Sequence, residues 1–180
     1  MLTEDATGPR AERLRGRNLL DELFRIRDAQ RDQQKTAIWL VKGQEVPWEI
    51  NQQGKMRWYL HPSIEDVCLR THLLYVQEIP PGSRSGRQRC QGGTIFYVVE
   101  GRGYTLLDGA KHAWEAEDVI CLPIPEEGVT FQHFNASATE RVLLIACEPN
   151  LIDALGVDKG SGFEQLENCP EYAAAQRAAR

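Results

Sequence analysis

Residues 80–103 read PPGSRSGRQRCQGGTIFYVVEGRG, and this stretch decides how the chain is interpreted. Its prolines and glycines predict a turn followed by a polar loop, because both residue types favour backbone conformations outside regular elements. Residues 94–100, TIFYVVE, are mostly β-branched or aromatic and predict a strand. Glycines at positions 101 and 103 predict a second turn after that strand.

The composition and charge of the whole chain narrow the class of protein. Of the 180 residues, 42% are hydrophobic and 26% are charged, which is typical of a soluble globular protein. The formal net charge of -5 argues against a nucleic-acid partner, because binding to phosphates requires a basic surface. The N-terminal residues lack the apolar core of a secretion signal, and no apolar run is long enough to cross a bilayer. We therefore expect a cytoplasmic protein with no membrane partner.

The five cysteines are odd in number and widely separated, with no CxxC pair. This pattern indicates neither a disulfide framework nor a zinc site. We expect three of them to be small buried residues, namely Cys68, Cys121 and Cys147.

Residues 19–34 predict a helix with one apolar stripe. Asn18 is the expected N-cap, and Asp21 stands in the first turn, where the helix dipole favours negative charge. The stripe can pack on the chain's own domain or on another subunit, and we treat residues 1–36 as an N-terminal helical extension. Its members are Leu19, Leu20, Leu23, Phe24 and Ile26.

Residues 37–150 predict a succession of short strands without helices between them. Asp108-Gly109 is a strong hairpin signal, because both residue types tolerate the positive φ angles of a tight turn. Such a pattern favours an all-β sandwich or barrel that closes its own edges. The expected strands are residues 37–41, 55–60, 66–79, 94–100, 104–107, 111–115, 119–122, 129–135 and 141–147.

Residues 151–180 form the expected C-terminal extension. The segment LIDAL at 151–155 predicts a single helical turn, GVDKGSG at 156–162 predicts a loop, and EYAAAQRAAR at 171–180 predicts a helix.

The strand order and two glycine-rich segments resemble the cupin family of small double-stranded β-barrels. The first cupin motif is G-x5-H-x-H-x3-E-x6-G. This chain reproduces its spacing without an insertion through Gly82, Gln88, Cys90, Thr94 and Gly101. The resemblance implies a single jelly-roll-like barrel over residues 37–150.

The second cupin motif, G-x5-P-x-G-x2-H-x3-N, is matched less closely. Three additional residues separate Pro123 from Gly128, and a glutamate stands in the first glycine position. The matching positions are Glu117, Pro123, Gly128, Phe131 and Asn135.

In metal-binding cupins, the motif histidines and glutamate hold a divalent metal such as iron. The corresponding positions here are Gln88, Cys90, Thr94 and Phe131. A glutamine oxygen is a weak neutral ligand, threonine is a poor one, and phenylalanine has no lone pair to donate. The resemblance therefore implies a degenerate site, and we expect this chain to bind no metal.

One alternative keeps a metal in the barrel. His133 lies two residues beyond Phe131, so in a strand the side chains of these two residues point to the same face. Together with Cys90 as thiolate and Gln88, it offers N, S and O ligands for a soft metal. The other interpretation is a hydrogen-bonded core histidine.

Two further groups of residues are candidate contact sites. Arg57, Trp58 and Tyr59 combine the side chains that are enriched at interface anchors, although they also fit a strand with ordinary buried aromatics. The basic loop is either solvated or in contact with an anion or partner. Its members are Arg84, Arg87 and Arg89.

Among cupins, this chain resembles the small, metal-free (alpha) subunit of the two-chain hydroquinone 1,2-dioxygenases. It is short, carries one predicted barrel, keeps the first motif's spacing and lacks its ligands. The resemblance implies an oxidoreductase of aromatic degradation, a larger cupin partner bearing Fe(II), and an α2β2 heterotetramer that opens para-diphenols to hydroxymuconic semialdehydes.

In such an enzyme this chain would carry no catalytic residue and would be inactive alone. It would support and shape the partner's active site, with the aromatic substrate bound mainly by the partner. Trp58, and after it Tyr59, are the side chains that we expect near that site. The competing hypothesis is a free-standing, metal-free cupin that binds a small apolar ligand as a carrier or sensor.

Overall fold

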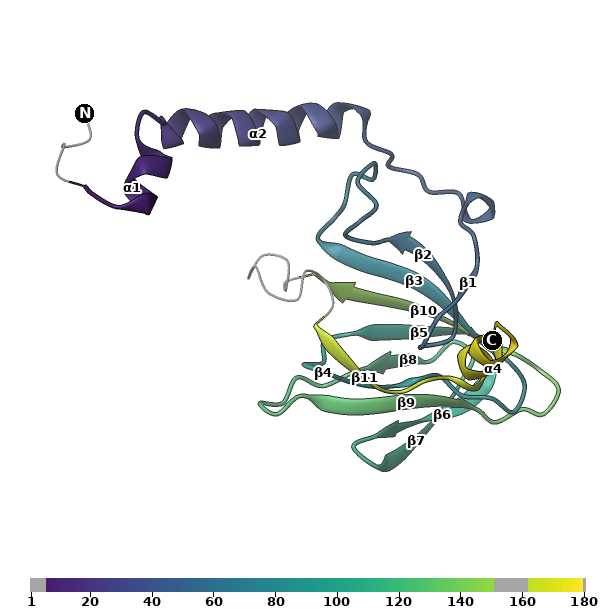
Figure 1. Ribbon diagram of the computed structural model, residues 1–180. Helices are drawn as coiled ribbons and strands as arrows, with labels where there is room; N and C mark the ends of the chain where they lie inside the picture. Colours follow the sequence, from purple (N-terminus) through teal and green to yellow (C-terminus); the bar gives the residue numbers. More distant parts are fainter. Residues whose placement is uncertain (1–5, 151–161, 180) are drawn as a thin grey trace. The chain divides into compact units, whose positions relative to one another are not determined.

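The computed structural model describes residues 6–150 and 162–179, and the chain divides into two compact units, Met1–Ala37 and Ile38–Arg180 (Figure 1). The first unit contains α1 (Pro9–Leu14) and α2 (Leu19–Thr36). No helix in the described ranges is long and apolar enough to span a membrane.

The predicted N-cap of α2 is confirmed. The Asn18 side chain accepts a hydrogen bond from the backbone N–H of Asp21 at 3.2 Å. This bond satisfies one of the N–H groups that a helix leaves without a partner in its first turn.

The second unit consists of two antiparallel sheets, as Figure 1 shows, and confirms the predicted all-β fold class. The six-stranded sheet has, in spatial order, β1 (Glu49–Ile50), β2 (Lys55–Leu60), β3 (His72–Ile79), β10 (Val142–Pro149), β5 (Ile95–Glu100) and β8 (Val119–Cys121). The five-stranded sheet has β11 (Phe163–Glu167), β4 (Arg87–Cys90), β9 (Val129–Asn135), β6 (Arg102–Leu107) and β7 (Ala110–Glu115). The described residues of this unit also include two short helices, η1 (Gly43–Glu45) and α4 (Pro170–Ala178).

The core lies between the two sheets, because alternate residues of each strand face inward. On β3 every second side chain is buried, and the same alternation continues on β10. Phe96 and Leu144 from one sheet belong to the same buried cluster as Val129, Phe131 and Trp114 from the other. These contacts across the sheets supply the main apolar burial of the fold.

The predicted hairpin at Asp108-Gly109 is confirmed. The two residues have φ angles of 48° and 86°, and they connect β6 to β7. Positive φ at both central residues gives the turn a twist that matches the flanking strands.

The strand predicted at residues 37–41 is wrong. Within this segment Ile38 forms one isolated parallel bridge with Val67, and Trp39 is 81% exposed. The apolar composition therefore does not reflect burial in the described structure. The strand predicted at residues 66–79 is half correct, because β3 begins only at His72.

Besides the two-residue β1, two of the described strands were not predicted from the sequence. β4 has the sequence RQRC and β11 has the sequence FEQLE, neither of which is enriched in β-branched residues. They pair with each other, and β4 also pairs with β9, so long-range backbone hydrogen bonds impose their conformation. β11 thus places part of the C-terminal segment in the barrel wall.

The expectation for the cysteines is also wrong. Cys68 and Cys121 are exposed, Cys147 is half-buried, and the fully buried cysteine is Cys169. Cys121 lies on an outward-facing position of the edge strand β8, where strand alternation rather than side-chain polarity sets exposure.

The predicted C-terminal helix is confirmed as α4, one residue earlier than expected at its start. Ser83 donates a hydrogen bond to Glu171 of this helix at 2.6 Å. The helical turn predicted at 151–155, and all but the last residue of the loop predicted at 156–162, lie outside the described residues.

Gly92 holds the loop after β4 against the second motif. A Cβ atom at this position would lie 1.8 Å from the carbonyl oxygen of Pro123, and its φ is 92°. Gly109 has a similar φ of 86° but open space around it. The two glycines therefore separate the effect of backbone strain from the effect of a steric clash.

We predict that Gly109→Ala lowers the free energy of unfolding by about 1–2 kcal/mol, which is the cost of left-handed backbone in a residue with a side chain. Gly92→Ala should cost about 3 kcal/mol more, because the added methyl group meets backbone that cannot rotate away. Urea unfolding of both variants measures this difference. Equal midpoints for the two variants would contradict the close approach of this loop to Pro123.

Candidate functional site

A cavity of about 790 Å³ opens into the barrel and is lined by the positions that correspond to the cupin metal ligands. Gln88, Cys90, Thr94 and Phe131 all belong to its wall. The pairing of β4 with β9 places Gln88 opposite Phe131 and Cys90 opposite Val129. The structure therefore brings together all four positions that motif spacing selected.

The side chain of Gln88 is bound within the barrel wall. It is buried, and its Nε2 donates a hydrogen bond to Gln165 Oε1 of β11 at 3.1 Å. Gln165 in turn donates to the carbonyl oxygen of Glu167 at 2.8 Å. This amide network joins β4 to β11, so the Gln88 side chain takes part in the structure of the barrel wall.

Thr94 is bonded to an acidic residue that sequence reasoning missed. Its Oγ1 donates to Glu148 Oε2 at 2.7 Å. Burial raises the pKa of Glu148, and the hydrogen bond from Thr94 lowers it in part. On β10, Glu148 lies two residues after Ala146 and four after Leu144, both of which are buried, so all three side chains share one face of the strand. This two-residue period in the sequence could have identified Glu148 as an inward-facing residue.

Cys90 and Phe131 complete the inner wall. Burial raises the pKa of the Cys90 thiol, and the negative charge of Glu148 raises it further, so the neutral thiol is favoured. Phe131 is buried against Phe96, with 5.8 Å between ring centroids. Neither group offers a charged ligand to a metal.

His133 is a fully buried residue of the core and has no part in the wall of this cavity as described. Trp114 Nε1 donates to Thr105 Oγ1 at 2.9 Å, and the same hydroxyl is hydrogen-bonded to His133 Nδ1 at 2.7 Å. The other ring nitrogen, Nε2, has no hydrogen-bond partner among the described residues. The Phe96 ring lies 4.5 Å away, edge to face.

The alternative metal site made of His133, Cys90 and Gln88 does not fit this geometry. Cys90 is paired with Val129, which lies four residues before His133 on β9. Four residues of extended strand span roughly 13 Å, which is far beyond the reach of one metal ion. The described ranges contain no group of three His, Cys, Asp or Glu side chains able to hold a metal. The donors of the cupin positions do not fit a divalent cation either.

Of the three aromatic-segment candidates, Trp58 alone lines the cavity as described. Its Nε1 donates to Glu49 Oε1 at 2.7 Å, and its ring centroid lies 4.9 Å from that of Tyr75. Arg57 instead donates to the carbonyl oxygen of Gly43 at 3.2 Å. The Tyr59 hydroxyl also lies beside Gly43, away from the cavity wall.

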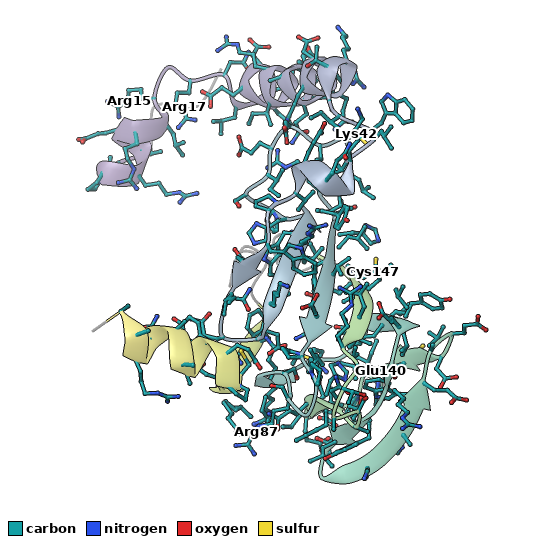
Figure 2. The ribbon with its side chains drawn as sticks, turned by 90° about the vertical axis from the view of Figure 1, so that its right-hand side faces the viewer. Arg15, Arg17, Lys42, Arg87, Glu140 and Cys147 are labelled. Atoms are coloured by element: carbon teal, nitrogen blue, oxygen red, sulfur yellow. The ribbon has the colours of Figure 1, made fainter. Side chains whose placement is uncertain are left out.

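The three arginines of the basic loop have partners inside the barrel unit. Arg84 forms an ion pair with Glu167 at 2.7 Å, and the exposed Arg87, labelled in Figure 2, approaches the same carboxylate at 3.8 Å. Arg89 donates to the carbonyl oxygen of Glu127 at 2.9 Å. These contacts favour a structural role for the loop.

No protein-family model matches the sequence, and neither does any curated protein. Solved structures do match. Vicilin from Corylus avellana (hazelnut) aligns at 14% identity over 72% of this chain and 34% of that chain, with a TM-score of 0.53. The polyketide cyclase RemF from Streptomyces resistomycificus aligns at 16% identity over 62% of this chain and 79% of that chain, with a TM-score of 0.51.

The barrel unit has a cupin fold. A cupin-like protein from Thermotoga maritima also aligns, at 19% identity over 64% of this chain and 78% of that chain, with a TM-score of 0.47. This chain spans only about a third of the vicilin. At these identities the likeness concerns the fold of the cupin barrel and carries no substrate with it.

Because the His133 imidazole is buried, the stability of the fold is expected to depend on pH. Burial lowers the pKa of His133 from 6.5 to about 3, so below pH 6.5 the unfolded chain binds a proton that the folded chain does not. The stabilisation from neutral His133 is therefore fully present above the unfolded pKa and is lost as the pH falls toward 3. Acidification to about pH 5 should cost about 2 kcal/mol through this residue.

The comparison of wild type with His133→Gln isolates this effect, because glutamine keeps a hydrogen-bonding side chain and does not titrate. Glu148 has a raised pKa and acts in the opposite direction, but it is present in both proteins. Urea unfolding at about pH 7 and about pH 5 should show a larger loss for the wild type than for the variant. Parallel losses in the two proteins would contradict a neutral His133.

Proposed function

We propose that this chain is the metal-free, non-catalytic cupin subunit of a hetero-oligomeric Fe(II) dioxygenase that opens hydroquinone-type rings. The observation that carries the proposal is the state of the four cupin ligand positions. All four line one cavity, yet the amide, hydroxyl and phenyl groups there are bonded to or packed on their own barrel. A barrel that keeps its fold without ligands suits a subunit that shapes another chain's site.

The apolar stripe of α2 supports a partner chain. Its side chains are between 42% and 59% exposed, and this helix as described has no buried residue. Exposed leucines and a phenylalanine along one face of a helix are typical of a surface that another chain covers. We assign that covering to the larger cupin subunit, in an α2β2 assembly.

The partner's Fe(II) supplies the chemistry of ring opening by molecular oxygen, which gives a hydroxymuconic semialdehyde. The role of this chain is to maintain the shape of the partner's pocket. Trp58 is the side chain that extends toward the substrate. Trp58 is half-buried at the cavity, where its ring packs on Tyr75 and His61. Such a ring presents a rigid apolar face to an aromatic substrate.

The stripe on α2 can be tested by co-expression with a larger cupin encoded in the neighbouring reading frame. Leu23→Glu/Phe24→Glu should reduce co-purification of the two chains at least about tenfold, because two charges would enter an apolar interface. The matched control is Arg25→Glu, which lies on the opposite side of α2 and changes the net charge by the same amount.

Retained assembly in the control and loss in the double variant support the proposal. If the wild-type chain forms a monodisperse homo-oligomer that ignores the larger cupin, the subunit role is wrong. Equal loss in both variants would mean that the apolar stripe is not the contact.

Trp58→Ala should lower kcat/KM of the assembled enzyme for hydroquinone about tenfold or more, while iron content and assembly stay unchanged. Trp39→Ala is the matched control, because Trp39 is 81% exposed and stands outside the described cavity wall. Steady-state kinetics with iron analysis of each preparation measures both effects. Normal kinetics in Trp58→Ala would remove this residue from the substrate pocket.

A second function is favoured by the cavity itself. Its volume of about 790 Å³ lies within the range of small-molecule sites, and apolar side chains such as Phe131 stand in its wall. A free-standing, metal-free cupin that binds a small apolar ligand as a carrier or sensor would use the same space. The co-expression experiment distinguishes the two functions.

A further inference from the structure

The cavity in this chain's own barrel contains an acidic group that the degenerate metal site does not explain. Glu148 accepts one hydrogen bond, from Thr94 to Oε2. Its other oxygen, Oε1, makes no hydrogen bond with a described residue, and no salt bridge in the described ranges reaches this half-buried carboxylate. Because Glu148 lines the cavity, this oxygen is available to a ligand there.

The other carboxylate of the cavity, Glu49, accepts two hydrogen bonds where Glu148 accepts one, both of them at the same oxygen. Glu49 Oε1 accepts hydrogen bonds from Trp58 Nε1 at 2.7 Å and from Asn51 Nδ2 at 2.6 Å. Among the described residues, the cavity wall includes these two glutamates and no lysine or arginine. The wall therefore attracts hydrogen-bond donors and repels anions.

The Tyr75 hydroxyl is a second polar group at this place. The residue is buried and lines the cavity, and its hydroxyl makes no hydrogen bond with a described residue. Burial raises the pKa of Tyr75, and the negative charge of the neighbouring Glu148 raises it further, so the hydroxyl keeps its proton. An acceptor on Glu148 and a donor on Tyr75 are thus available in the same cavity.

The walls around these two groups are aromatic. Trp58 packs on the Tyr75 ring at 4.9 Å, and Phe131, one of the four cupin ligand positions, also lines the cavity. Flat apolar walls with a few polar groups are typical of sites for ring compounds.

We propose that the barrel of this chain binds a small neutral phenol, whose hydroxyl donates to Glu148 Oε1 and accepts from the Tyr75 hydroxyl. A hydroxyl group supplies both a donor and an acceptor, which matches Glu148 Oε1 and the Tyr75 hydroxyl. The same wall also has unpartnered amide atoms on Asn150 and Gln53. An ammonium group has donors only and leaves Tyr75 without an acceptor, whereas a carboxylate meets the charge of Glu148. The site lies in this chain's own barrel.

Isothermal titration calorimetry of the full chain, alone and without added metal, tests the proposal with phenol and hydroquinone as probes. Benzylamine and benzoate are the comparison ligands of similar size. Both phenols should bind, and benzoate should bind at least about tenfold more weakly, because its charge repels that of Glu148.

Three variants locate the binding. Glu148→Gln should weaken phenol binding at least about tenfold, and Tyr75→Phe should weaken it about threefold or more, because each removes one partner of the ligand hydroxyl. Glu49→Gln is the matched control, since it makes the same substitution in the same cavity at a carboxylate that already has donors, and it should change binding less than about twofold. Thermal unfolding of each variant verifies that it is folded.

The proposal is overturned if phenol fails to bind the wild type at about 10 mM. It is also overturned if benzoate binds as tightly as phenol, or if Glu148→Gln and Glu49→Gln have equal effects. Because neither partner nor iron is present, a negative result leaves the subunit role intact. Failure of the subunit role leaves this binding site intact.

Discussion

The pairing of β4 with β9 is the constraint on which the rest of the account depends. It sets Gln88 opposite Phe131, and the strands on either side then determine which groups those residues meet. β11 adds Gln165 next to Gln88, and in the other sheet β10 pairs with β5 and brings Glu148 to Thr94, the residue before β5. The positions where cupins carry metal ligands are therefore satisfied by neighbouring side chains rather than left vacant.

The same register separates the sulfur ligand Cys90 from the nitrogen ligand His133 of the alternative metal site. Cys90 lies at the cavity, whereas His133 lies further along β9 among Phe96, Phe131 and Trp114. Neutral imidazole suits this apolar surrounding, because a charged ring there would have no counter-ion and no water. The burial that lowers the pKa of His133 thus also explains why it belongs to the core.

The sequence predicted the parts of the fold that depend on local preferences. The N-cap of α2, the turn at Asp108-Gly109 and the strand at residues 129–135 follow from side chains close in sequence, and each is present. β4 and β11 could not be predicted in this way, because their polar sequences become strands only through pairing with distant segments.

The candidate site, like the fold, has residues that the sequence predicted and residues that it did not. Motif spacing found the four residues of the emptied ligand positions, because spacing along a strand fixes which side chains share a face. It missed Glu148 and Tyr75, which are not ligand positions and reach the cavity from β10 and β3. Their contribution depends on how the two sheets oppose each other, and no short motif records that arrangement.

The stripe on α2 marks a further limit of sequence reasoning. Its spacing predicted a helix with one apolar face, and the described helix has that face exposed. The sequence of the helix does not specify which surface covers this face, so assembly has to be measured.

The most direct test of the central claim is the metal content of the purified chain after incubation with Fe(II), Mn(II) and Zn(II) and removal of unbound ions. The account predicts less than about 0.1 metal ion per chain by mass spectrometry, because the cupin positions supply no suitable ligand set. One tightly held ion per chain, lost in Cys90→Ser or His133→Gln, would contradict it.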